Sequence, residues 1–82
     1  MGDRLLKLKT LRKRLRAFGV QEDPSRGKGS HTMFVKIFDD GTSTYPIPTT
    51  RKDILACYVT GCRRVFRLTE EDGVSDADFY GE

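Results

Sequence analysis

Two segments with helical spacing enclose a stretch with strand spacing, and this order constrains the fold more than any other feature of the chain. Within residues 4–18 the apolar side chains recur three and four positions apart, which predicts an amphipathic helix with a buried stripe of Leu5, Leu8, Leu11, Leu15 and Phe18. Asp3 stands where it would cap the first turn. A second helical pattern covers residues 50–66, and Thr50 followed by Asp53 resembles a capping box. We therefore expect one helix before the strands and one after them.

Three strand patterns separate the two predicted helices. Residues 20–23 are expected to form an edge strand that ends at a proline. Residues 31–38 alternate along the strand but hold apolar side chains on both faces, so the pattern does not decide which face is buried. Residues 39–41, Asp-Asp-Gly, favour a tight type I′ hairpin turn, and residues 42–45 return as the partner strand before the next proline.

The length of the chain limits it to one modest core. A chain of 82 residues leaves no room for a second domain of ordinary size. The order helix, strand, strand, strand, helix predicts an α+β fold in which a three-stranded antiparallel sheet carries two helices on one face, as in double-stranded-RNA-binding domains. We place this domain at residues 1–68 and an acidic C-terminal tail at residues 69–82.

Signals for a membrane segment or a metal site are absent from the sequence. No apolar run approaches the roughly 18 residues of a spanning helix, and the N-terminus lacks the apolar block of a signal peptide. We therefore expect a cytoplasmic protein. Cys57 and Cys62 with one histidine cannot supply the four ligands of a zinc site. Both thiols are expected to be reduced, at least one of them in the core, with no metal or other cofactor.

Charge is divided unevenly along the chain. Residues 1–68 hold all 15 Lys and Arg and six of the 12 acids, a formal charge of +9, whereas residues 69–82 hold the other six acids and no cation. The first predicted helix, residues 4–18, contains no acid that could pair at helical spacing with its cations, which are Arg4, Lys7, Lys9, Arg12, Lys13, Arg14 and Arg16. Such a face repels itself, so a polyanion such as RNA is the expected partner, with Arg12 and Arg16 as candidate phosphate contacts. A merely solvated face is the alternative.

Segment 26–31, Arg-Gly-Lys-Gly-Ser-His, leads from a basic, glycine-rich turn to the only histidine of the chain. Cations and free backbone N–H groups suit a phosphate, and the unperturbed pKa of imidazole lies close to neutrality, which suits a general base. His31 is therefore the candidate catalytic residue, and the candidate RNA contacts of this turn are Arg26, Lys28, Gly29 and Ser30. The competing interpretation is a solvated histidine that only begins a strand.

Several parts of the chain follow one another in a recognisable order. The first helix ends at Phe18-Gly19, and the string Gly29-Ser30-His31-x-x-Phe34, a hairpin, the exit Tyr45-Pro46-Ile47-Pro48 and a second helix follow. Over about residues 4–68 the chain thus resembles the HicA toxins, also described as YcfA-like small ribonucleases of prokaryotic toxin–antitoxin pairs. In that family the histidine of this string is taken as catalytic, and His31 occupies the matching position. The resemblance implies metal-independent cleavage of messenger RNA, restrained by a HicB-like antitoxin protein.

The resemblance and the residues together suggest a mechanism for an mRNA interferase. His31 would deprotonate a ribose 2′-hydroxyl for attack on the adjacent phosphate, while Arg26, Lys28 and nearby backbone N–H groups would stabilise the growing charge. Tyr45, Lys28 or water would protonate the leaving oxygen. The alternative is a non-catalytic RNA-binding module of the same fold, which replacement of His31 by Ala would distinguish from an enzyme.

The acidic residues 69–82 allow two interpretations. A mobile tail is the default, because a terminal acidic segment with few apolar residues buries little surface. Alternatively the segment folds back on the basic body, with Val74, Phe79 and Tyr80 as anchors and Ser75 with Asp78 capping a final helical turn. In that case we expect removal of the residues after Leu68 to tighten RNA binding at low salt without abolishing the fold.

Overall fold

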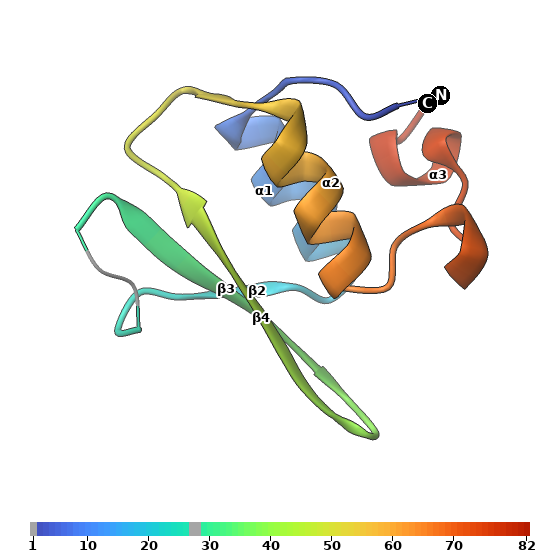
Figure 1. Ribbon diagram of the computed structural model, residues 1–82, viewed down its shortest axis with the longest axis horizontal. Helices are drawn as coiled ribbons and strands as arrows, with labels where there is room; N and C mark the ends of the chain where they lie inside the picture. Colours follow the sequence, from blue (N-terminus) through green and yellow to red (C-terminus); the bar gives the residue numbers. More distant parts are fainter. Residues whose placement is uncertain (1, 27–28) are drawn as a thin grey trace.

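The computed structural model describes residues 2–26 and 29–82, so the predicted RNA contact Lys28 lies outside the described residues. Its elements are β1 (Leu6–Lys7), α1 (Leu8–Ala17), β2 (Gln21–Asp23), β3 (His31–Phe38), β4 (Gly41–Pro48), β5 (Asp53–Ile54), α2 (Ala56–Val65), a 3₁₀ turn η1 (Glu70–Asp72) and α3 (Asp76–Tyr80) (Figure 1). Strands β2, β3 and β4 form an antiparallel sheet with β3 in the centre, which confirms the predicted α+β layout. No described helix is long and apolar enough to cross a membrane.

The register of the sheet decides which face of β3 is buried. Phe34 pairs with Tyr45, and Thr32 pairs with Ile47, so these side chains project to one side of the sheet. Phe34 is only 1 % exposed, whereas Ile37 on the opposite face is 77 % exposed. The helices therefore cover the Phe34 face, where the core forms with the apolar residues of α1 and α2, among them Leu11, Leu15, Val59 and Cys62.

Helix α1 begins later than the predicted residue 4. Leu6 and Lys7 are extended and pair as β1 with β5, so the helix starts at Leu8, with Lys7 as an N-cap that makes no side-chain bond. The predicted stripe is correct from Leu8 onward, but Leu6 is buried in place of Leu5, which is 50 % exposed. The prediction that Asp3 caps this helix is wrong.

Helix α2 also begins later than predicted. Asp53 and Ile54 form β5, and the N-cap of α2 is Leu55 without a side-chain bond, so the predicted capping box at Thr50 is wrong. The helix continues through Gly61 as expected and has Phe66 as its C-cap.

Strand β4 is longer than the predicted 42–45. It extends to Pro48 through Pro46, which an edge strand tolerates because its free edge needs no ladder donor. The connection at residues 39–40 is tight, as predicted, with Phe38 opposite Gly41. It is not a type I′ turn, because such a turn needs positive φ at both central residues, and here Gly41 has the positive φ, 146°.

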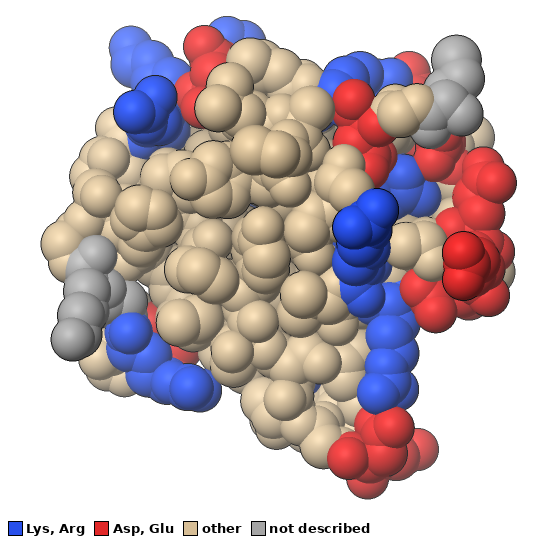
Figure 2. Space-filling model, in the orientation of Figure 1, with Lys and Arg blue, Asp and Glu red and all other residues tan. Residues whose placement is uncertain are grey.

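Residues 69–82 fold against the rest of the molecule, so the default expectation of a mobile tail is wrong. Ser75 Oγ accepts a hydrogen bond of 3.0 Å from the backbone N–H of Asp78, which confirms the predicted cap of the final turn. Phe79 is fully buried in the common core and stacks with Phe18. Acidic side chains gather along the side of the molecule that this segment forms (Figure 2).

The two chain ends lie next to each other (Figure 1), and Arg63 of α2 links them. Its Nη1 donates to Asp3 at 2.9 Å and to Asp76 at 2.7 Å, and its Nε donates to the carbonyl oxygen of Leu68 at 2.8 Å. The hydroxyl of Tyr80 also donates to Asp3, at 2.7 Å. Asp3 thus connects the ends of the chain through space instead of capping a helix.

The cysteines agree with the expectation that at least one lies in the core. Cys62 is buried, Cys57 is exposed, and both are free thiols. Burial raises the pKa of Cys62 to about 12, so this thiol stays protonated at neutral pH.

Candidate nucleic-acid interface

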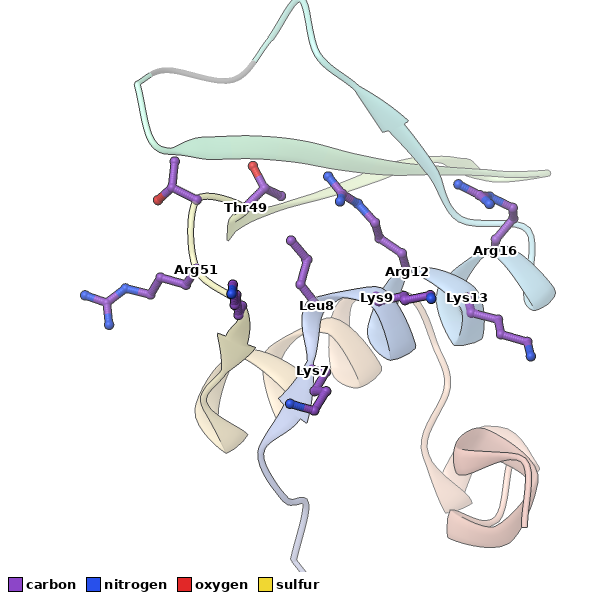
Figure 3. A pocket seen from close by; sticks show the side chains of 10 residues that line it. Lys7, Leu8, Lys9, Arg12, Lys13, Arg16, Thr49 and Arg51 are labelled. Carbon is purple, nitrogen blue, oxygen red and sulfur yellow. The ribbon is translucent and has the colours of Figure 1, made fainter.

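A groove of about 670 Å³ lies between α1 and the segment 49–52 that follows β4 (Figure 3). No described acid lines this groove, and its lining includes seven cations: Lys7, Lys9, Arg12, Lys13, Arg16, Arg51 and Lys52. Charges of one sign in a concave surface strengthen the local potential. The groove is therefore suited to a polyanion, and Arg12 and Arg16, two of the predicted RNA contacts, lie in it.

Local structure explains how these cations come together. Helical spacing of three and four residues places Lys9, Arg12, Lys13 and Arg16 along neighbouring rows of α1. The pairing of β1 with β5 holds segment 49–52 at the start of α1, where the N–H of Leu8 donates to the carbonyl oxygen of Lys52 at 2.7 Å. In Figure 3, Arg12 and Arg16 extend from α1 toward the sheet.

The basic face of α1 is partly paired, which corrects the prediction of an unpaired face. Glu22 of β2 accepts a hydrogen bond of 3.0 Å from Arg12 Nε and lies 3.9 Å from Arg16 Nη2. These pairs join α1 to the sheet and fix the positions of both arginines. The groove cations that form no ion pair with any described residue are Lys9, Lys13, Arg51 and Lys52.

His31 lines a second, smaller hollow of about 270 Å³ directly beside the groove. Thr50 and Arg51 line both cavities, and the other residues of the hollow are Ser30, Pro48, Asp53, Leu55 and Tyr58. The hairpin register brings His31 close to the segment after β4, because His31 at the start of β3 pairs with Pro48 at the end of β4. The N–H of Thr49 then donates to the carbonyl oxygen of Ser30 at 3.0 Å.

The imidazole of His31 is half-buried and has a hydroxyl beside one ring nitrogen. Nδ1 lies 3.1 Å from Ser30 Oγ. In the tautomer in which Nδ1–H donates to that oxygen, Nε2 carries no proton and can accept one. Ser30 would then orient the ring, as the orienting partner of a general base does.

Two further predicted contacts of the turn, Arg26 and Gly29, do not line either cavity. Gly29, with a φ of 57°, and Arg26, whose N–H donates to the carbonyl oxygen of Asp23 at 3.2 Å, are not among the described lining residues of either cavity. The candidate acid Tyr45 packs against Gly61 of α2, where burial raises its pKa. Tyr58 is instead the phenol that lines the hollow of His31.

Sequence reasoning missed Arg51, Lys52 and Tyr58. One signal for the two cations was present in the sequence. In a hairpin whose first strand starts at His31, the second strand must end close to His31, and residues 49–52, Thr-Thr-Arg-Lys, directly follow the end of that second strand. The predicted second strand ended at residue 45, so Arg51 and Lys52 were not placed near His31. The position of Tyr58 depends on where α2 begins.

The candidate site has to be judged on its own geometry. Comparisons of the chain with models of protein families, with curated proteins and with solved structures found no match. Within residues 2–26 and 29–82, no group of three or more His, Cys, Asp or Glu side chains could hold a metal ion.

Proposed function

We propose that the protein is a toxin-type endoribonuclease that binds RNA in the cationic groove and cleaves it without a metal ion, with His31 as general base. The observation that carries this proposal is the position of the hollow with His31 beside the groove, with Arg51 lining both. A phosphate held at their boundary would have its ribose next to the imidazole. Messenger RNA as substrate, a cytoplasmic location and a HicB-like antitoxin that covers the groove belong to the same proposal.

The proposed reaction uses residues of this hollow. His31 Nε2 takes the proton of the ribose 2′-hydroxyl, the 2′-oxygen attacks the adjacent phosphorus, and the bond from phosphorus to the 5′-oxygen breaks. The products are a 2′,3′-cyclic phosphate and a 5′-hydroxyl. Arg51 stabilises the charge that develops on the phosphoryl oxygens. The leaving 5′-oxygen takes its proton from Tyr58 or from water.

The test of catalysis is RNA cleavage by the purified chain in EDTA, with wild type beside His31→Ala. We expect wild type to cleave, and His31→Ala to cleave about 10²–10⁴-fold more slowly with unchanged RNA affinity, because one acid–base group is lost. Cleavage by the variant at the wild-type rate would contradict the role of His31. Binding by wild type without cleavage would identify the alternative, a non-catalytic RNA-binding module.

The test of the groove is the salt dependence of RNA affinity. Lys9 and Lys13 are better targets than Arg12 or Arg16, because charge reversal at the arginines would also break their pairs with Glu22. For Lys9→Gln with Lys13→Gln we expect weaker binding and a salt slope reduced by up to about 2. Arg64→Gln is the control, because it removes one exposed cation of α2 that lies outside the groove and forms no ion pair with a described residue. An equal loss of affinity per charge removed would argue against the groove.

A further inference from the structure

The hollow beside His31 has an apolar side that phosphate binding does not use. Pro48, Leu55 and Tyr58 contribute to its lining. Leu55 is 51 % exposed, which is unusual here because most large apolar side chains of the chain are buried. The first turn of α2 sets the position of Tyr58, whose N–H donates to the carbonyl oxygen of Leu55 at 3.0 Å. An aromatic ring and an exposed leucine thus meet at one cavity next to the candidate catalytic residue.

The same hollow also offers hydrogen-bonding groups of both kinds. Ser30 and Thr50 carry hydroxyls, Arg51 a donor guanidinium and Asp53 an acceptor carboxylate. Its volume of about 270 Å³ is near the lower end of small-ligand pockets. A planar ring with donors and acceptors on its edge suits this combination, whereas a base-paired helix is too large to enter.

We propose that the hollow binds one unpaired nucleobase of the RNA, stacked on Tyr58, so that single-stranded RNA is the substrate class. This inference rests on the proposed function, because the base belongs to the nucleotide whose 2′-hydroxyl faces His31. Unpaired bases are commonly held by stacking on aromatic side chains, whereas a base in a duplex must first be unstacked and flipped out.

The first test uses wild-type protein and single nucleotides, so it does not depend on a variant that folds. The ring proton resonances of Tyr58 are followed by NMR during titration with each of the four nucleoside 3′-monophosphates, and with inorganic phosphate as the control. Ring-current shifts with at least one nucleotide and none with phosphate are expected. Identical shifts with phosphate, or no shift with any nucleotide, would overturn the inference.

The second test compares a single-stranded RNA with a duplex of the same length. Tyr58→Ala should weaken binding of the single strand about 5- to 150-fold, the range that corresponds to one stacked base, and leave duplex binding unchanged. Tyr58→Phe should retain binding because it keeps the ring. Since Tyr58 also packs against the core, the exposed Leu55→Ser provides a second variant, for which a weaker effect in the same direction is expected.

The outcomes distinguish this inference from the function on which it rests. Equal losses for single strand and duplex, or no loss with either variant, would overturn the base-binding hollow, while cleavage that depends on His31 would leave the proposed function intact. Failure of wild type to bind either RNA would overturn both.

Discussion

Single residues far apart in the sequence hold the two ends of this chain together. Arg63 is 4 % exposed, yet each nitrogen of its guanidinium donates a hydrogen bond, to Asp3, to Asp76 or to the carbonyl oxygens of Leu68 and Val74. A buried charge without such partners would be costly. Arg63 therefore ties the N-terminus and the C-terminal segment to α2.

Replacement of Arg63 by Leu should destabilise the fold by about 3–5 kcal/mol, because it leaves Asp3 in a largely buried position without its cation. Urea unfolding at neutral pH measures the loss. Arg64→Leu is the matched control on the next position of α2, where the side chain is exposed and forms no ion pair with a described residue, and a change within about 0.5 kcal/mol is expected. Similar losses for both variants would show that the Arg63 contacts do not stabilise the fold.

The lowered pKa of the Asp3 carboxyl predicts that the folded protein loses stability in acid. Burial alone would raise the pKa of Asp3, but hydrogen bonds from Arg63, Tyr80 and Thr60 outweigh burial and hold the pKa below its ordinary value of 3.8. A carboxyl whose pKa is lower in the folded than in the unfolded state contributes its full stability at pH values above the pKa of the unfolded state. This contribution is lost as the pH falls through the pKa of the folded state. The stability advantage of wild type over Asp3→Asn should therefore be constant above about pH 5 and shrink below about pH 4. Unfolding by urea at several pH values measures it, and an advantage that grows in acid would contradict the assignment.

At the scale of elements, α2 and β4 make an unusually close contact. The ring of Tyr45 lies so near Gly61 that a Cβ atom added to Gly61 would overlap the hydroxyl and ring atoms of Tyr45. Glycine inside a helix ordinarily costs about 1 kcal/mol relative to alanine. Here the cost is offset by the packing of an aromatic side chain of the sheet directly on the helix backbone.

Gly61→Ala should consequently destabilise the fold by about 1–3 kcal/mol, although alanine is the better helix former. The contact with Tyr45 is the stated cause, so the same change in a Tyr45→Val background should be neutral or stabilising by up to about 1 kcal/mol. Chemical denaturation of the four proteins of this double-mutant cycle measures the coupling. Additive effects of the two changes would show that Tyr45 is not the obstacle.

At the scale of the whole molecule, the acidic C-terminal segment is structural. Three of its six acids have partners within the fold, because Asp76 binds Arg63, Asp72 caps η1 and Glu82 pairs with Arg4. Arg14 adds a hydrogen bond of 2.7 Å to the carbonyl oxygen of Phe79. None of the described acids of this segment lines the cationic groove.

Truncation after Leu68 should therefore abolish cooperative folding or lower the melting temperature strongly, contrary to the expectation from sequence that the fold survives. The buried ring of Phe79 alone is worth about 3–5 kcal/mol on replacement by Ala, and the truncation also removes Asp76 from Arg63. Thermal unfolding followed by circular dichroism measures the effect. Glu70→Gln with Glu71→Gln, which removes exposed charge and keeps the segment, is the control that should melt near wild type. A truncated chain that melts like the full chain would refute the structural role.

The sequence by itself determined the elements whose signals are local. The stripe of α1 from Leu8 to Leu15, the tight turn at residues 39–40, the helical period through Gly61 and the cap at Ser75 each depend on residues a few positions apart. Such patterns reflect backbone geometry and nearest-neighbour hydrogen bonds, which a chain carries before it folds. Their order was sufficient for the fold class and for His31 as a candidate.

Only the tertiary structure decided the contacts between distant segments. The pairing of β1 with β5 involves two residues on each strand, which are too few for a periodic signal. Because of this pairing, both helices begin later than the sequence predicted. The pair of Arg12 with Glu22, the network of Arg63 and the packing of Tyr45 on Gly61 join residues whose separation in sequence carries no period. The hollow lined by His31 likewise depends on the register of β3 with β4 and on the start of α2, because these bring Arg51 and Tyr58 to the same cavity.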